Sequence, residues 1–207
     1  MSESLLPRHP QLSASSRSAA LNRYVDGADL AELGILIAAG SGAAVTVACL
    51  DFHLRVPGHA ILRAMLPMAL GLSLAPRRFG GLVMGSSAYG TALLLRFAGG
   101  PTPGIGAFTS LCLLGPMLDL VLWHARGGWR LYARFALAGC LANLAAFTVR
   151  GGGKWVGLDA WHARPLSDWA TVAPWTYSLC GLIAGLVCAA VWFRLRAVEA
   201  GADAVES

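Results

Sequence analysis

Long apolar runs alternate with short polar breaks along most of the chain. Six apolar runs stand out, and they cover residues 30–50, 60–75, 79–98, 105–123, 131–149 and 169–193. Most of them approach the ~20 residues that an α-helix needs to cross a ~30 Å hydrocarbon layer. No stretch shows the continuous alternation of a barrel strand, and helices are then the only spanning structure. The pattern predicts an all-α fold, a polytopic membrane bundle of about six transmembrane helices.

The second run is the weak crossing, because it is short and contains Arg63 and Pro67. We expect it to be tilted, bent or partly shielded from lipid. Glycine and proline breaks mark the gaps, and among them residues 151–153 predict the end of the fifth helix. Residues 1–28 are predicted as a polar cytoplasmic segment, 29–196 as the transmembrane domain, and 197–207 as a short cytoplasmic tail.

Composition supports a surface that contacts membrane lipid. Of the 207 residues, 56% are hydrophobic and 13% are charged, and the mean hydropathy is +0.59. Globular domains carry roughly 25% charged residues. The arginines stand mostly between the apolar runs, which is typical of membrane loops and not of a nucleic-acid-binding face. The five cysteines lie within apolar runs without CxxC spacing, so neither a disulfide framework nor a zinc site is predicted.

Arginine placement predicts the orientation, because cytoplasmic loops of membrane proteins collect positive charge. More arginines fall on the inner side when the N-terminus is inside, which places both termini in the cytoplasm. The expected location is the bacterial inner membrane. The positive residues that then fall on the outer side or at outer helix ends are Arg55, Arg63, Arg96, Arg150, Lys154 and Arg164.

Small residues recur at a spacing of four in two of the predicted helices. The first contains the pairs Gly34/Ala38 and Gly40/Ala44, and the sixth contains Gly181/Gly185. Such pairs let another helix approach the backbone closely. They serve either packing within this bundle or docking of a separate membrane subunit, for which Gly34, Ala38 and Ala44 are the candidate residues.

Polar side chains at membrane depth are costly, and each is a candidate functional residue. The candidate substrate contacts are His59, Arg63, Asn143, Arg150 and Trp161. The outer loops combine aromatic, hydrogen-bonding and positively charged residues, and interfacial aromatic and arginine belts have the same composition. Near the inner end of the fourth helix, Asp119 is expected to pair with Arg126 or Arg134.

Enzymatic activity is not expected. The segment Gly85-Ser86-Ser87-Ala88-Tyr89-Gly90 is superficially similar to the serine turn of an intramembrane protease, but the sixth helix has no histidine to activate the serine. The sequence also lacks an HExxH motif, a paired-glutamate motif and a glycine-rich lysine loop for phosphate. No cofactor is predicted, and ATP hydrolysis by this chain alone is not expected.

The small-residue first helix is followed by the segments VPGHAIL (56–62), GGLVMG (80–85), LGPMLD (114–119) and CGLIAG (180–185). With these segments, its length and its six apolar runs, the chain resembles the S component of an energy-coupling factor (ECF) transporter. The resemblance covers residues 30–196 and is mainly architectural. It implies an integral membrane subunit that captures a vitamin or metal from the outer side. Its partners would be a transmembrane coupling subunit and two ATPase subunits.

Gly58-His59 before a small apolar helix is also similar to the cobalt/nickel-type S components, in which a histidine after Ser-Gly binds metal. That role would carry over to His59 alone, because this chain begins Met1-Ser2 and lacks the Met-His N-terminus of the subfamily. His53, His59 and His162 are the alternative metal ligands, with oxygen from Asp51 or Asp159. A non-transporting scaffold or assembly protein and a stand-alone secondary carrier are the other open functions.

Overall fold

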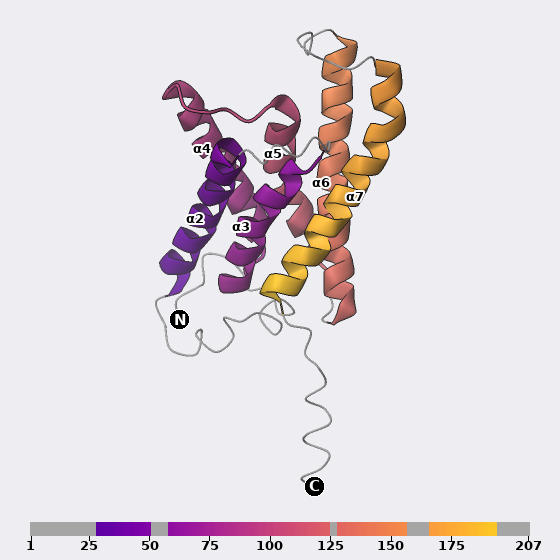
Figure 1. Cartoon of the computed structure of the whole chain (residues 1–207). Coiled ribbons are helices and arrows are strands. Elements are labelled where there is room, and N and C mark those ends of the chain that lie inside the picture. Colours follow the sequence, from indigo (N-terminus) through magenta and orange to yellow (C-terminus); the bar gives the residue numbers. More distant parts are fainter. Residues whose placement is uncertain (1–27, 51–57, 125–127, 157–165, 194–207) are drawn as a thin grey trace.

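The computed structural model describes residues 28–50, 58–124, 128–156 and 166–193. Six α-helices account for most of these residues: α2 (Ala28–Cys49), α3 (Ala60–Leu74), α4 (Gly80–Phe97), α5 (Ile105–Leu122), α6 (Trp129–Trp155) and α7 (Leu166–Trp192). They run alternately up and down, and the start of α2 and the end of α7 lie at the same end of the bundle (Figure 1). We name this end the inner end. The opposite end, where α3 begins and α6 finishes, is the outer end.

The prediction of an all-α bundle is confirmed. Four segments in the described parts of the chain are long and apolar enough to cross a membrane: Leu30–Cys49, Ile105–Leu122, Trp129–Trp155 and Ala170–Trp192. Helix α4 has 18 residues, but glycine, serine and Arg96 make it less apolar. Helix α3 has 15 residues, a length of about 22 Å. The chain is therefore an α-helical membrane protein, and the two less apolar helices complete the predicted six.

The short helix α3 lies at the centre of the bundle and contacts all five other helices. Ile61, Met65, Met68 and Leu72 on α3 are almost completely buried. Its neighbours therefore shield from lipid a helix that is too short to cross the hydrocarbon layer alone. This burial confirms that the second apolar run is partly shielded.

Glycine residues let helix backbones touch at two crossings. A methyl group at Gly81 of α4 would overlap the carbonyl oxygen of Gly115 on α5, and the reverse substitution would overlap Gly81. Helices α6 and α7 meet in the same way through Gly139 and Gly181, and Gly185 lies against the α6 backbone one turn further on. Such contacts are typical of membrane helices, which gain close packing from small residues. The internal packing interpretation of Gly181 and Gly185 is confirmed.

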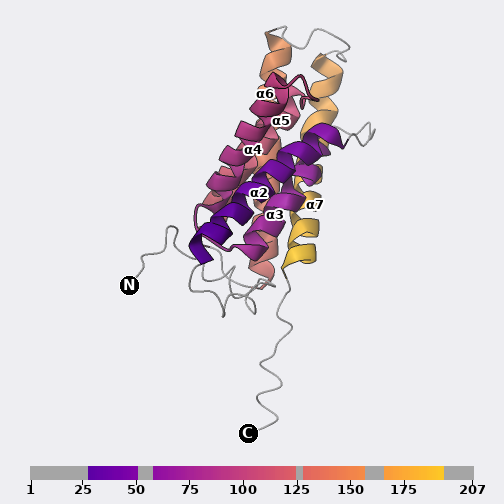
Figure 2. The same ribbon diagram turned by 90° about the vertical axis from the view of Figure 1, so that its left-hand side faces the viewer.

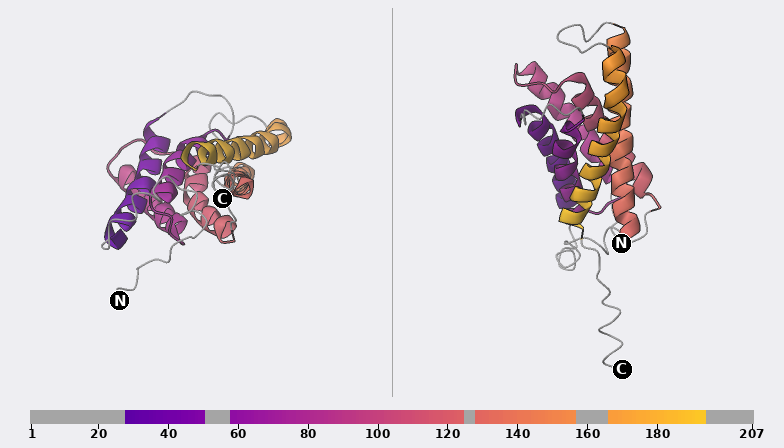
Figure 3. Two further views of the ribbon diagram at one scale, coloured as in Figure 1. Left: turned by 90° about the horizontal axis from the view of Figure 1, so that it is seen from below. Right: turned by 45° about the vertical axis from the view of Figure 1, so that its right-hand side comes forward.

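The predicted end of the fifth helix at residues 151–153 is wrong, because α6 continues through these glycines to Trp155. The ladder of backbone hydrogen bonds also continues, since the amide of Val156 donates to the carbonyl of Gly152 at 3.0 Å. Glycine in a helix costs only about 1 kcal/mol. Helices α6 and α7 each have 27 residues, about 40 Å, and project beyond α4 and α5 at the outer end (Figures 1 and 3).

Helix α2 lies at the edge of the bundle, where it packs mainly against α3 and α4 (Figure 2). Glu32, Leu36, Gly40, Ala43 and Val47 form its buried side. Residues at this spacing share one helix face. The opposite face of α2 is therefore open along most of its length.

Candidate functional site

The outer end of the bundle is organised around the buried amide of Asn143. This residue is 1% exposed, and its Nδ2 donates to the carbonyl oxygens of Tyr177 at 2.7 Å and Gly58 at 3.1 Å. Gly58 has φ +88°, and a Cβ atom there would lie 2.8 Å from the amide nitrogen. Glycine is thus required by both the backbone conformation and the close approach. Asn143 joins α6, α7 and the turn before α3, and it acts as a positioning residue.

Arg150 lies about two turns further along α6, half-buried between three helices. Its Nη1 is 3.4 Å from the hydroxyl oxygen of Tyr177, a distance at the long end for a hydrogen bond. Gly106 of α5 borders both groups, because a Cβ atom there would lie 3.4 Å from Arg150 Cδ and 3.5 Å from the tyrosine oxygen. The ring of Phe147 packs 5.7 Å from that of Tyr177. The Arg150 guanidinium and the Tyr177 hydroxyl thus lie side by side where α5, α6 and α7 meet.

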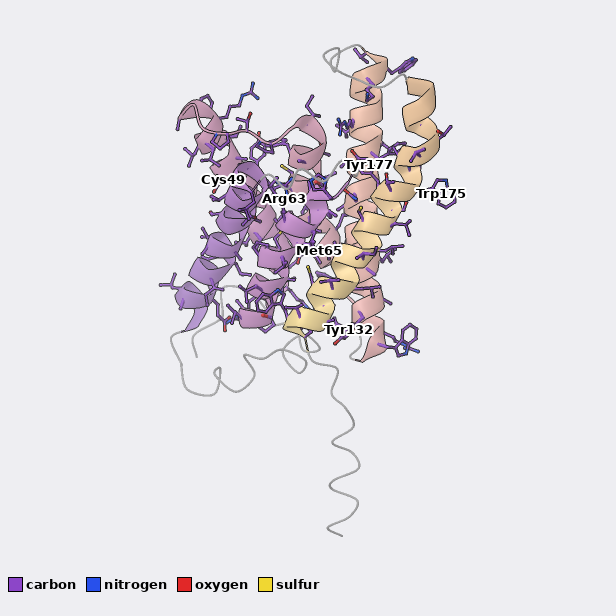
Figure 4. The ribbon with its side chains drawn as sticks, viewed as in Figure 1. Cys49, Arg63, Met65, Tyr132, Trp175 and Tyr177 are labelled. Carbon is purple, nitrogen blue, oxygen red and sulfur yellow. The ribbon has the colours of Figure 1, made fainter. Side chains whose placement is uncertain are left out.

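His59 and Arg63 lie one turn apart at the start of α3. His59 is the N-cap residue of the helix, and its side chain makes no capping hydrogen bond. The Nε of Arg63 is buried and has no hydrogen-bond partner among the described residues. Thr46 of α2 donates to the carbonyl of Arg63 at 3.0 Å, which fixes the helix position. Figure 4 shows Arg63 and Tyr177 in the half of the bundle toward the outer end.

Five basic side chains are described in the outer half of the bundle: His59, Arg63, Arg96, Arg150 and Lys154. The acidic side chains that the structure describes, Glu32 and Asp119, both lie in the inner half. These positive charges create a potential that attracts anions, and the first turn of α7 at this end also contains Asp168. The described part of the outer end is therefore suited to a ligand that carries negative charge.

The acidic residues of the inner end have structural partners. Glu32 of α2 forms a buried ion pair with Arg77 in the turn before α4, and both side chains are at most 5% exposed. The carboxylate of Asp119 accepts hydrogen bonds from the backbone amides of Gly81 at 3.0 Å and Leu82 at 2.7 Å. It caps the N-terminus of α4, where a negative charge is stabilising.

The predicted pairing of Asp119 with Arg134 is wrong, because that arginine donates instead to the carbonyl of Val121 at 2.7 Å. Arg126, the alternative partner, lies outside the described residues. The close crossing of α4 and α5 decided the outcome by bringing unpaired backbone amides to the carboxylate.

The three predicted docking residues do not share one environment. Gly34 and Ala38 are exposed, and no atom lies within 4 Å of a Cβ built at Gly34. Ala44 is completely buried in the chain's own core, so its assignment to an external docking face is corrected. The open small-residue face of α2, which we name the α2 stripe, consists of Ala31, Gly34, Ala38 and Gly42.

Several predicted site residues lie outside the described residues, namely Trp161, His53 and His162. Among the described residues no group of three or more His, Cys, Asp or Glu side chains is placed to hold a metal ion. The metal prediction rests on His59 alone within this part. Tyr177 and Gly106 were not predicted. Tyr177 could have been found from the sequence, because it is a tyrosine within an apolar helix and its hydroxyl group needs a polar partner.

The fold and the outer end together define an α-helical membrane protein with a basic, partly buried polar cluster at one end. No protein-family model matches the chain, and neither a curated protein nor a solved structure matches it.

Proposed function

We propose that the chain is the substrate-capture subunit of a membrane uptake transporter. The basic character of the described outer end carries this proposal. Arg150 and the Tyr177 hydroxyl meet there between α5, α6 and α7, in the same half of the bundle as His59 and Arg63. The architectural resemblance to ECF S components supports the same function.

The ligand that fits this end best is a small organic molecule with a negatively charged group. Arg63 and Arg150 would attract the negative group, since guanidinium groups bind carboxylate or phosphate through two parallel hydrogen bonds. The Tyr177 hydroxyl can donate or accept a hydrogen bond and would orient the molecule. Asn143 holds the surrounding helices in place. His59 and Trp161 remain predicted contacts.

Energy for uptake would come from separate subunits, because the sequence contains no glycine-rich lysine loop for ATP phosphates. The α2 stripe would contact a transmembrane coupling subunit in the bacterial inner membrane, and two ATPase subunits would drive the cycle. Small residues allow close approach of a partner helix. In the described residues, Gly34 and Gly42 have no neighbouring atoms that would hinder such an approach.

Native mass spectrometry of the full-length protein in mild detergent tests substrate capture. We expect a small anionic molecule to co-purify with the wild type and to be lost in Arg150→Gln. Arg96→Gln is the matched control, because Arg96 is exposed in the last turn of α4 and should leave the bound molecule unchanged.

The capture function would be contradicted if the wild type carried no small molecule. It would also be contradicted if Arg150→Gln carried as much of the small molecule as the wild type. If membrane subunits co-purify in the absence of any small molecule, the scaffold or assembly function replaces it. A bound divalent metal in place of an organic molecule would favour the cobalt/nickel-type alternative.

A further inference from the structure

A second basic and aromatic group lies at the inner end of α4 and α5, remote from the candidate substrate site. The guanidinium carbon of Arg78 is 5.1 Å from the centre of the Trp123 ring. The ring of Phe79 meets that of Trp123 edge-on, with centroids 5.4 Å apart and an angle of 65° between the planes. The cation and the two rings thus form one cluster, which we name the Arg78 cluster.

The backbone holds Phe79 in an unfavourable conformation. Its φ of 63° makes it the sole non-glycine residue with positive φ in the described parts of the chain. Aromatic residues rarely adopt this region, and such strain persists only where the surroundings enforce it. Here Asp119 binds the amides of Gly81 and Leu82 directly after the turn. The strained turn keeps the Phe79 ring on the surface beside Trp123.

The charge of Arg78 has no carboxylate partner in the described structure. Its Nε is buried without a hydrogen-bond partner among these residues. Glu32 pairs with Arg77, and both carboxylate oxygens of Asp119 accept backbone amides. An arginine stacked on an aromatic ring still offers the edge formed by its two terminal Nη groups, which matches two phosphate oxygens.

The surroundings of the cluster are those of a lipid headgroup region. Phe79 is 40% and Trp123 is 39% exposed, and the neighbouring Leu82 and Leu120 are 50% and 68% exposed. The leucines continue an apolar surface along α4 and α5, while exposed Trp129 begins α6 at the same end. Aromatic rings favour the headgroup level. The predicted orientation places this end on the cytoplasmic side, where basic residues attract anionic lipids.

We propose that the Arg78 cluster binds the phosphate of an anionic phospholipid in the inner leaflet. Arg78 would bind the phosphate oxygens, and the Phe79 and Trp123 rings would contact the glycerol and the upper acyl chains. Leu82 and Leu120 extend this contact toward the membrane interior. The proposal is independent of the transport function.

Native mass spectrometry with added lipid tests this site on the full-length protein. The wild type is titrated with phosphatidylglycerol and, separately, with phosphatidylcholine of the same acyl chains. We expect preferential binding of phosphatidylglycerol, and about tenfold weaker binding of it by Arg78→Gln, since a charge-assisted bidentate contact is lost. Trp123→Leu should also weaken binding. Arg96→Gln, at the other end of α4, should bind like the wild type.

Arg78→Lys provides a variant that keeps the charge but loses the planar edge, and it should bind with intermediate affinity. Circular dichroism of each variant checks that the helices remain intact. Equal affinity of wild type and Arg78→Gln for phosphatidylglycerol would overturn the site, as would equal affinity of the wild type for the two lipids. Displacement of the lipid by an equal concentration of inorganic phosphate would overturn the assignment to a lipid.

Discussion

The side-chain nitrogen of Asn143 lies 2.7 Å from the carbonyl oxygen of Tyr177, in a part of the bundle that is almost completely closed to solvent. The same nitrogen reaches Gly58, so that one amide joins α6, α7 and the approach to α3. A polar side chain within a membrane bundle is tolerated when its hydrogen bonds are made inside the protein. This contact sets the positions of Tyr177 and of the first turn of α3 relative to each other.

Replacing Asn143 by leucine should lower the stability of the bundle by about 1 kcal/mol, the usual range for hydrogen bonds between membrane helices. The variant loses both contacts and also places a branched side chain beside Gly58. Thermal unfolding in detergent, followed by the reaction of buried Cys188 with a thiol-specific dye, measures the change. Thr148→Val is the control, because Thr148 is exposed and bonds only within its own helix. Equal midpoints for the two variants would contradict the bridging role.

The close crossing of α6 and α7 predicts opposite outcomes for two glycine-to-alanine substitutions. Gly181→Ala should destabilise the protein by about 1–3 kcal/mol, because the added methyl overlaps the backbone of Gly139 and forces the helices apart. Gly90→Ala should leave stability unchanged or raise it by up to about 1 kcal/mol, because no atom lies within 4 Å of its Cβ and alanine favours helix. Thermal unfolding in detergent measures both variants. An equal loss of stability in the two would argue against the close contact between Gly139 and Gly181.

The helices themselves were predictable from the sequence, because apolar length is the dominant signal in a membrane protein. Their starts and ends agree with the apolar runs to within a few residues for α2 to α5. The end of α6 was missed because a run of three glycines is a weak stop signal. Its backbone hydrogen bonds can continue, and here the helix extends to Trp155.

The orientation of each helix about its own axis was not predictable in the same way. In α2 the pairs Gly34/Ala38 and Gly40/Ala44 look equivalent, yet only the second pair faces the bundle. A helix that is apolar on all sides carries no polar face to indicate which side is buried. Asn143 and Arg150 were chosen as candidate residues because polar residues are rare in apolar helices. The position of Gly106 beside Arg150 depends on tertiary packing.

The buried ion pair between Glu32 and Arg77 predicts that substitutions of these two residues have non-additive effects on stability. Glu32→Ala should cost about 3–5 kcal/mol, because it leaves the Arg77 guanidinium buried without its carboxylate. The double variant Glu32→Ala/Arg77→Ala should lose less than the sum of the two single variants, by more than about 1 kcal/mol. A thermal-unfolding double-mutant cycle measures this coupling, with exposed Arg130→Ala as the control for lost surface charge. Strict additivity would mean that the two residues stabilise the protein independently.

The two faces of α2 predict that bulk is tolerated at one small residue and not at another. Gly34→Leu should keep the unfolding midpoint near that of the wild type, because the space beside this residue is open. Ala44→Leu should destabilise by about 1–3 kcal/mol, because its methyl group is completely buried and the core is already filled.

Gly34→Leu also tests whether the α2 stripe is a docking face for another subunit. If the α2 stripe contacts a coupling subunit, Gly34→Leu should reduce co-purification of membrane partners from the native host while the monomer stays folded. Gly90→Leu on α4 is the matched control, because no atom lies within 4 Å of its Cβ, and it should leave co-purification unchanged. Undiminished association of Gly34→Leu would exclude the stripe as the docking face. Loss of the folded monomer in that variant would instead show that the face is covered by this chain's own residues, because only an occupied surface makes added bulk destabilising.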